Sequence, residues 1–332
     1  MTTLTAPAAG TTNTSRTVGD SGTAAVIACA GGESAAAEVG TTVGEVGTTV
    51  GDVVVGSLSP SRAGDFMACP LRYRFRVVDK LPEPTSPAAA RGTLVHAVLE
   101  RLFDLPAAER TPAAAVALLS PAWAALLSDE PELAAVLGES GGDEAAWFEA
   151  ATGLLGSYFS LEDPQRLQPV ARELLVEHVL EGGLRLRGYV DRLDEAPTGE
   201  IRVVDYKTGR APGPAFERSA LFQLKFYALV IWKTRGSVPR ELRLLYLGNA
   251  QRLVYHPDAD ELTSFERTLR ALWSAIDRAH TSGDWRASPG RLCDWCSHQA
   301  LCPAFGGTPP PLPLRATARI EEPAPTVCES AG

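Results

Sequence analysis

Several features that would move the protein out of the ordinary globular class are missing from its sequence. No uninterrupted apolar run approaches the roughly 18–20 residues that a transmembrane helix needs. The first ten residues have neither the basic region nor the apolar segment of a signal peptide. The 332 residues are 45% hydrophobic and 21% charged, which excludes a wholly disordered chain. We therefore expect one large or two ordinary domains, located in the cytoplasm and without a membrane partner.

Positive charge is also scarce, because 31 Lys and Arg face 40 Asp and Glu, for a net charge of −9. A protein that only binds nucleic acid usually has a basic excess, whereas a metal-dependent nuclease can balance its carboxylates with divalent cations. The pattern Gly-x₄-Gly-Lys-Ser/Thr does not occur, so no ATP site of that type is encoded. Charge alone does not separate a catalytic protein from a binding protein.

The two ends of the chain differ in composition from its middle. Residues 1–56 are low-complexity Ala, Gly, Thr and Val, and we expect them to form a disordered leader. Residues 306–332 are rich in proline and are expected to be an extended or disordered tail. Residues 57–305 are expected to fold as one domain, with a helical insertion at about 106–165.

Apolar periodicity predicts both helices and strands in the folded part. Helices are expected at about 60–68, 87–105, 215–232 and 261–281. Strands are expected at 184–190 and 201–206, with Gly199 in the turn between them, and a further hairpin at 242–255.

Each of the first two predicted strands ends in an aspartate, Asp191 and Asp205, and Lys207 follows two residues after the second. Residues two apart on a strand project from the same face, so Asp205 and Lys207 point the same way. A short hairpin can bring Asp191 beside Asp205, and adjacent carboxylates repel unless a cation lies between them. The pattern indicates a Mg²⁺ or Mn²⁺ site, and a surface hairpin with ordinary salt bridges is the alternative.

Three more polar side chains lie on predicted helices. Gln223 and Tyr227 are four residues apart, which places them on one helical face. His96 follows Gly92-Thr-Leu-Val, and a lone helical histidine is more often a packing or surface residue than a ligand.

In this order the motifs resemble those of the PD-(D/E)XK nucleases, in particular the RecB-like branch. Asp191-Arg-Leu-Asp and Val204-Asp-Tyr-Lys-Thr-Gly are similar to the core motifs. Gln223-x₃-Tyr227 is similar to the helical motif that follows them, and His96 to a helical metal ligand. The resemblance covers about residues 57–305 and implies an α/β restriction-endonuclease-like fold, with a central mixed sheet flanked by helices.

The resemblance also implies an activity, which is metal-dependent hydrolysis of DNA by an exonuclease acting on single strands or DNA ends in repair and recombination. The implied catalytic residues are Asp191, Asp205, Lys207, Gln223 and Tyr227, and the implied ligands of Mg²⁺ or Mn²⁺ are His96, Asp191, Asp205 and the carbonyl of Tyr206. Lys207 would orient or activate the attacking water. Because RecB-like domains are normally fused to helicases, a separate helicase or repair-complex subunit is an expected partner. The alternative is a non-catalytic DNA-binding or assembly subunit.

Four of the six cysteines form a one-plus-three pattern, with Cys69 early and Cys293-x₂-Cys296-x₅-Cys302 late. Four cysteines suit either Zn²⁺ or an iron–sulfur cluster, and their spacing does not separate the two. Iron–sulfur members of the RecB-like branch, including the AddB nuclease domain and the CRISPR adaptation nucleases, have the same layout. The resemblance therefore implies a [4Fe–4S] cluster that joins the two ends of the domain.

Two further groups of side chains have open roles. Tyr73 lies among three arginines, at 72, 74 and 76, and this mixture is typical of a single-strand channel; a solvated basic face is the alternative. Glu177, before the first strand, is expected to be either a support for a metal ligand or a surface charge.

Overall fold

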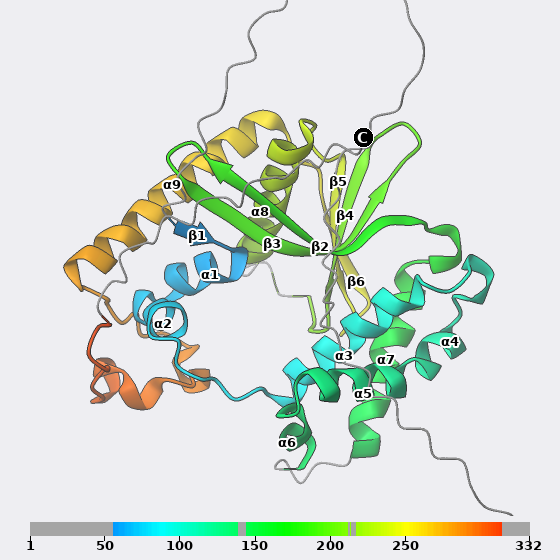
Figure 1. The fold of residues 1–332 in the computed structure, drawn as a ribbon, viewed down its shortest axis with the longest axis horizontal. Helices are drawn as coiled ribbons and strands as arrows, with labels where there is room; N and C mark the ends of the chain where they lie inside the picture. The colour runs from blue at the N-terminus through cyan, green and yellow to red at the C-terminus, as the bar shows by residue number, and fades with distance from the viewer. Residues whose placement is uncertain (1–55, 139–143, 212, 214–216, 314–332) are drawn as a thin grey trace, which may run out of the picture. The chain divides into compact units, whose positions relative to one another are not determined.

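The computed structural model describes residues 56–138, 144–211, 213 and 217–313 (Figure 1). The expected leader at 1–56 lies outside the described residues except for its last position, and the expected tail is described only as far as residue 313. The strands are β1 (Gly56–Leu58), β2 (Pro169–Leu180), β3 (Leu184–Glu195), β4 (Ile201–Lys207), β5 (Glu241–Tyr246) and β6 (Gln251–Tyr255). The α-helices are α1 (Pro60–Ala68), α2 (Pro70–Tyr73), α3 (Pro87–Leu102), α4 (Pro112–Ala117), α5 (Leu119–Asp129), α6 (Leu133–Gly138), α7 (Glu144–Leu161), α8 (Glu217–Arg235) and α9 (Ala259–Ser282).

A single mixed sheet contains the six strands, in the order β1-β3-β4-β5-β6, with β2 paired to β3. The β2–β3, β3–β4 and β5–β6 pairs are antiparallel. The β1–β3 and β4–β5 pairs are parallel. A parallel pair needs a crossover connection, and α8 supplies it between β4 and β5. The expected α/β fold with a central mixed sheet is confirmed.

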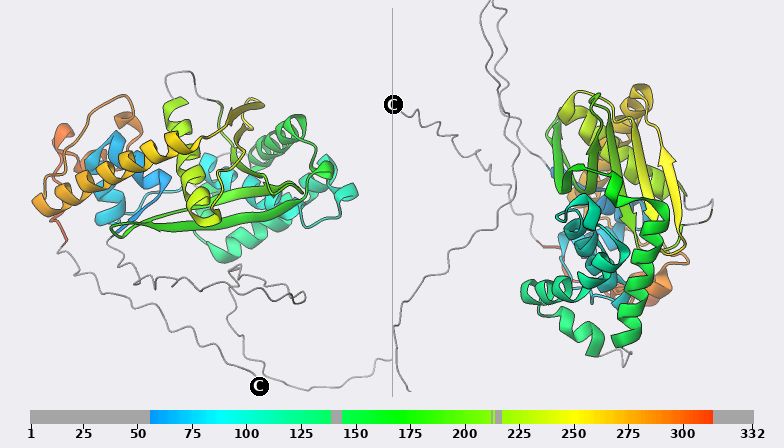
Figure 2. Two further views of the ribbon diagram at one scale, coloured as in Figure 1. Left: turned by 90° about the horizontal axis from the view of Figure 1, so that it is seen from above. Right: turned by 90° about the vertical axis from the view of Figure 1, so that its right-hand side faces the viewer.

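Helices pack on both faces of the sheet and bury two apolar clusters. The first lies between the sheet and α8 and α9, and the second lies between the sheet and α3, α5 and α7. Strand β4 contributes to both, because Val203 belongs to the first cluster while Val204 and Tyr206 belong to the second. Figure 2 (left) shows α9 running along one side of the long β2–β3 ribbon. Period-two alternation along β4 therefore decides which side chains enter each core.

Local sequence signals set the ends of the main helices. Ser59 and Ser86 cap α1 and α3 by accepting hydrogen bonds from backbone N–H groups, and each is followed by a proline at the first helical position. Asp258 caps α9 in the same way, and Gly283 ends it with a φ of 73°.

Two strands were not predicted. Strand β1 has only three residues, and its pairing with Leu184–Leu186 cannot be read from so short a segment. In β2, polar residues interrupt the apolar alternation, which hides the strand. It forms because the turn through Gly182 and Gly183, with φ values of 89° and 83°, folds it back antiparallel on β3.

One stretch of the described residues, 112–129, has a high mean hydropathy, although serine and proline interrupt its apolar residues. By length and hydropathy alone, this stretch passes as a membrane span. In the structure it forms α4 and α5, and Ala115, Leu119, Ala122 and Trp123 are buried in the second apolar cluster.

The buried Arg192 on β3 links the helices to the sheet, through Glu162 after α7 and Tyr206 on β4. Arg192 is 0% exposed, and its guanidinium donates to Asp194 Oδ1 at 3.0 Å, Glu162 Oε2 at 2.7 Å and the Tyr206 hydroxyl at 2.9 Å. Glu162 follows α7, while the other partners lie on β3 and β4. Burying a charged group is unfavourable unless it is paired and hydrogen-bonded, and Arg192 meets both conditions.

We predict that Arg192→Met lowers the free energy of unfolding by about 3 kcal/mol, because it removes the fully buried partner of Glu162 and Asp194 and leaves them only the more exposed Arg243 and Arg202. Arg202→Met is the matched control: Arg202 also binds Asp194, but its side chain is 27% exposed, so the loss should be about 1 kcal/mol or less. Urea unfolding of both variants measures the difference, and equal losses would contradict the prediction.

Candidate active site

Asp191 and Asp205 lie where β3 and β4 separate. The two strands pair from Glu195–Ile201 up to Arg192–Val204, and the next opposed residues would be the two aspartates, which are not paired in the ladder. Instead, the backbone N–H of Tyr206 donates to Asp191 Oδ2 at 2.5 Å. Both aspartates are largely buried, with exposures of 9% and 3%. We call the point where β3 and β4 separate, after the Arg192–Val204 pair, the fork. The fork holds two carboxylates next to each other.

The side chains of Lys207 and Gln223 bind the two oxygens of Asp205. Lys207 Nζ is 2.6 Å from Oδ2, and Gln223 Nε2 donates to Oδ1 at 2.8 Å. Gln223 Nε2 also lies 3.3 Å from the hydroxyl of Tyr227, one turn further along α8. Gly188 admits this packing, because a Cβ there would lie 2.8 Å from the ring of Tyr227. The structure therefore joins four of the five expected catalytic side chains by polar contacts, namely Asp205, Lys207, Gln223 and Tyr227.

The fifth expected residue, Asp191, groups with His96 and with a glutamate that sequence reasoning missed. His96, from α3, places Nδ1 3.5 Å from Asp191 Oδ2 and 4.0 Å from Glu173 Oε1. These three residues each offer a ligand atom within 4.8 Å of the others. Glu173 lies on β2 with a φ of 43°, a strained value for a non-glycine residue.

Other expected ligands are placed differently. Glu177 is exposed and lies opposite Arg187 in the β2–β3 ladder. Asp205 is not part of the three-residue ligand group, and its oxygens contact Lys207 and Gln223. The Tyr206 side chain is turned toward Arg192, and its ring lies edge-on to His96 at 5.9 Å.

Burial and neighbouring charges shift the pKa values of three residues of the site. Burial raises the pKa of Asp205 to about 6, and the charge of Asp191 adds to this while Lys207 opposes it. Burial and the charge of Asp191 raise the pKa of Glu173 to about 7, with His96 opposing. Burial acts to lower the pKa of His96, but the hydrogen bond and charge of Asp191 outweigh it, so that the pKa is raised. An added cation would relieve this repulsion.

The donor set fits a divalent cation. Carboxylate oxygens are the ligands that Mg²⁺ prefers, and Mn²⁺ accepts both carboxylate and imidazole. His96, Asp191 and Asp205 line a cavity of about 770 Å³, which gives a phosphate-containing substrate access to them. Glu173 lines a second cavity of about 520 Å³, which His96 shares.

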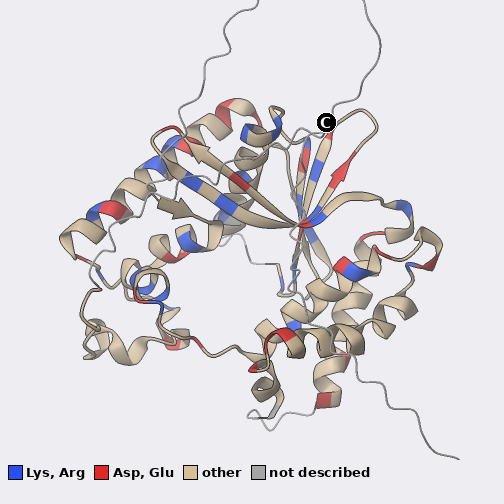
Figure 3. Ribbon diagram, in the orientation of Figure 1, with Lys and Arg blue, Asp and Glu red and all other residues tan. Residues whose placement is uncertain are grey.

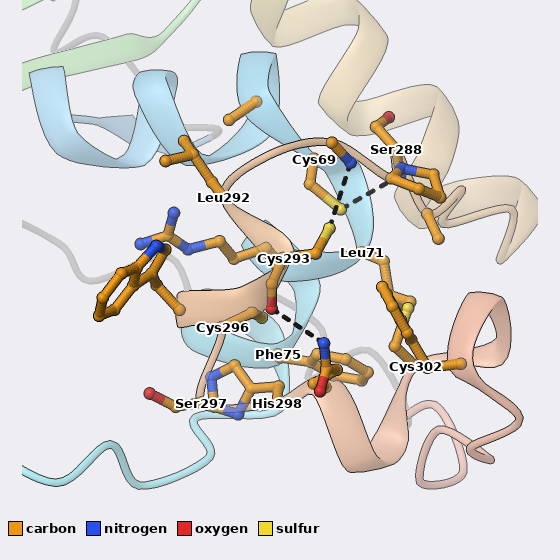
Figure 4. A pocket seen from close by; sticks show the side chains of 18 of the residues that line it. Cys69, Leu71, Phe75, Ser288, Leu292, Cys293, Cys296, Ser297, His298 and Cys302 are labelled. Carbon is orange, nitrogen blue, oxygen red and sulfur yellow. Dashed lines mark hydrogen bonds between the residues drawn. The ribbon is translucent and has the colours of Figure 1, made fainter.

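The four cysteines of the one-plus-three pattern line a separate cavity of about 530 Å³ (Figure 4). Cys69 follows the last residue of α1, and the other three lie on a C-terminal segment of short 3₁₀ turns. The sulfur atoms of Cys69 and Cys293 accept backbone N–H groups at 3.4 and 3.3 Å. The structure thus brings together cysteines from opposite ends of the described chain, and all four are free thiols.

The basic channel expected around Tyr73 is wrong. Tyr73 is only 3% exposed and stacks on Trp285 with a centroid distance of 5.9 Å. Arg74 is buried and pairs with Asp79 at 3.0 Å, and Arg76 pairs with acidic residues on both sides. Of this group only Arg72 lines the cavity at the aspartates. The Tyr73 ring instead packs on Trp285, more than 200 residues later in the chain, and the local sequence around Tyr73 does not indicate this contact.

Comparison with known proteins identifies the superfamily of the chain. The family model of the PD-(D/E)XK nuclease superfamily matches residues 57–303, and the chain belongs to that superfamily. The fold and the family together define a nuclease, and therefore a hydrolase by class.

The individual relatives are distant. The Gene 69 protein of Mycobacterium phage L5 is 29% identical over 126 residues, which are 37% of this chain and 41% of that protein. The match therefore spans about two fifths of that relative. A crystal structure of a provisionally assigned exonuclease from Eubacterium rectale has 13% identity and a TM-score of 0.49, covering 73% of this chain and 87% of its own. The crystal structure of SSO0001 has 15% identity and a TM-score of 0.37, with coverages of 75% and 86%.

We predict that Asp205→Asn stabilises the metal-free protein at pH 8 by about 1–3 kcal/mol. The folded pKa of about 6 lies above the reference value of 3.8, so the contribution of this group to stability is full below about pH 3.8 and is lost as the pH rises through 6. The neutral amide removes that loss, so its advantage should be smaller at pH 5 than at pH 8.

Urea unfolding in the presence of a chelator measures the effect. Asp194→Asn is the matched control, because Asp194 binds Arg192 and Arg202 and its neutralisation should destabilise the fold at pH 8. A destabilised Asp205→Asn protein at pH 8 would show that the carboxylates are not in repulsion.

Proposed function

We propose that the protein is a Mg²⁺- or Mn²⁺-dependent deoxyribonuclease of the RecB-like branch, an exonuclease that acts on single-stranded DNA or DNA ends. The observation that carries the proposal is the meeting of His96, Asp191, Asp205 and Lys207, from three different elements, at one cavity. A binding subunit has no need for a lysine bonded to one of two adjacent buried carboxylates. This favours the enzyme over the non-catalytic alternative.

Each side chain has a proposed part in phosphodiester hydrolysis. His96, Glu173 and Asp191 would hold the cation, with Asp205 beside them. When bound, the cation lowers the pKa of a coordinated water and neutralises charge on the phosphate. Lys207 is 33% exposed while its Nζ contacts Asp205, so it can also donate to a water or to a phosphate oxygen in the cavity.

Gln223 and Tyr227 are proposed to act as positioning residues rather than as contacts to the reacting atoms. Gln223 donates to Asp205 and lies within hydrogen-bond distance of Tyr227, so α8 fixes the orientation of that carboxylate. Burial raises the pKa of the Tyr227 hydroxyl, which therefore stays protonated near neutral pH. A protonated hydroxyl can donate to a DNA strand in the cleft.

The four cysteines are proposed to hold a [4Fe–4S] cluster. Their sulfur atoms line one cavity, and two already accept backbone N–H groups, as cluster ligands commonly do. Four cysteine sulfurs also suit a tetrahedral zinc ion, with Zn–S bonds of about 2.3 Å, and the metal content of the protein separates the two groups. Hydrolysis transfers no electrons, so the cluster would act as a structural clasp.

The wider setting is also a proposal. DNA repair and recombination is the expected context, with residues 57–305 as the nuclease domain and the cytoplasm as its location. The sequence contains no Walker-type ATP motif, so strand separation would be the work of a separate helicase or repair-complex subunit.

We predict that Asp205→Ala and Lys207→Ala each lower the rate of DNA cleavage by about a hundredfold or more, because both act at the reacting phosphate. Lys225→Ala is the matched control, since Lys225 lies on α8 but pairs with Glu261 outside the cavity. Single- and double-stranded DNA, labelled at either end and incubated with Mg²⁺ or Mn²⁺, gives the rate, the strand preference and the polarity. Full activity of either well-folded variant would remove the proposed site.

We predict that His96→Ala raises the metal concentration needed for half-maximal activity by about tenfold or more, because one ligand is lost. Mass action then allows excess metal to restore part of the activity. Glu173→Gln should behave in the same way if it is a ligand. The measurement is a Mn²⁺ titration of cleavage, and an equal loss at every metal concentration would instead indicate a packing role.

We predict that Cys69→Ser yields colourless, less stable protein in which DNA binding and cleavage are lost together. Anaerobic purification followed by iron, sulfide and zinc analysis tests this, with Cys29→Ser as the control outside the described residues. One zinc and no iron in the parent protein would make the cluster assignment wrong. Unchanged iron content and stability in Cys69→Ser would exclude Cys69 as a ligand.

A further inference from the structure

We propose that Tyr189 stacks on an unpaired DNA base beside the active site, while Arg187 and Arg62 bind the neighbouring phosphates. This inference rests on the proposed nuclease function and names the residues that select a single strand as its substrate.

Tyr189 has the right position for this role. It precedes Asp191 by two residues on β3, which corresponds to about 6.7 Å along the strand. Both side chains line the same cavity of about 770 Å³. Asp191 is only 9% exposed, whereas Tyr189 is 54% exposed. A base next to the bond being cut would therefore meet this ring.

The ring of Tyr189 also lacks a partner within the protein. Among the described residues, it has no hydrogen bond, ring contact or cation contact. Most other tyrosines in that part of the chain do have such contacts, namely Tyr73, Tyr158, Tyr206, Tyr227 and Tyr255. A large exposed aromatic ring gains stability when its face is covered, and a nucleobase can cover it.

Two arginines in the same cavity lack a carboxylate partner. Neither Arg62, in the first turn of α1, nor Arg187, on β3, forms an ion pair with any residue that the structure describes. Arg72, by contrast, is 3.6 Å from Asp65. Figure 3 shows basic segments along the β2–β3 ribbon that leads to the fork. These cations can hold the phosphates of a strand whose scissile phosphate faces the acidic group.

The arrangement selects single strands for a physical reason. In a duplex each base is stacked on both faces and paired, so an amino-acid ring cannot reach a base face without unstacking it. A single strand offers its bases freely, and base–aromatic stacking is tolerant of sequence. The cleft would therefore prefer unpaired DNA without preferring a particular base.

The test measures binding of a fluorescent oligothymidylate in the presence of Mg²⁺, in a Lys207→Ala background that keeps the DNA intact. We expect Tyr189→Ala to weaken binding by about 5- to 150-fold, the range for loss of one stacked base. Tyr189→Phe should restore most of the affinity, whereas Tyr189→Leu, apolar but without a π face, should not. The high exposure of Tyr189 means that these variants should fold, and thermal unfolding checks this.

Abasic DNA separates stacking from other contacts. Oligothymidylates with one abasic nucleotide at successive positions near either end should include one to which parent and Tyr189→Ala bind equally. Arg187→Ala should weaken binding to normal and abasic DNA by the same factor and reduce the salt dependence by about one phosphate contact. Arg252→Ala, on β6 and exposed outside the cavity, should change neither.

Several results would overturn the inference. One is parent-like affinity of Tyr189→Ala for every oligonucleotide, and another is an equal loss on normal DNA and on each abasic DNA. Failure of the proposed function looks different. If the parent protein cuts no DNA but the stacking effect is present, the nuclease proposal is wrong while the binding role of Tyr189 stands.

Discussion

The separation of β3 from β4 after the Arg192–Val204 pair is the constraint on which the site depends. Up to that pair, the ladder satisfies the backbone groups of both strands, and beyond it the Asp191 carboxylate accepts the N–H of Tyr206. Asp191 and Arg192, which are consecutive on β3, then project to opposite faces of the sheet. Asp191 faces the cavity, while Arg192 anchors the fork to the helical layer through Glu162 and Tyr206. A shift of one residue in this register would exchange the two.

The fork concentrates negative charge that the metal-free protein neutralises only in part. Lys207 pairs with Asp205, and His96 lies between Asp191 and Glu173. Burial, together with the charge of Asp191, raises the pKa values of Asp205 and Glu173 despite these cationic partners. Stability and the proposed function would therefore oppose each other here, because buried negative charge that weakens the metal-free fold would also attract a cation. The buried Arg192 network, in which every charge is paired, holds β3 and β4 in place beside these carboxylates.

Helix α1 connects the two candidate sites. Its first turn lines the cavity at the aspartates through Arg62, and Cys69 at its end lines the cysteine cavity. Arg72, one turn later, lines both cavities. Holding Cys69 to the C-terminal cysteines would therefore fix α1 against the cleft, and stacking of Tyr73 on Trp285 strengthens the same contact. The proposed cluster would in this way affect DNA binding without taking part in the chemistry.

By itself the sequence determined what is local: the Asp205–Lys207 spacing on one strand and the helical pair Gln223 and Tyr227 follow from the periods of strand and helix. The one-plus-three cysteine pattern was also evident from the sequence, but the sequence does not give the distances between the sulfur atoms. Only tertiary structure decided the place of Glu173, because the pairing of β2 with β3 carries it to Asp191. Tertiary structure likewise decided the exposure of two tyrosines, since packing on Trp285 buries Tyr73 while Tyr189 stays exposed. Local periodicity fixes the face on which a side chain lies, but contacts between distant segments decide what covers that face.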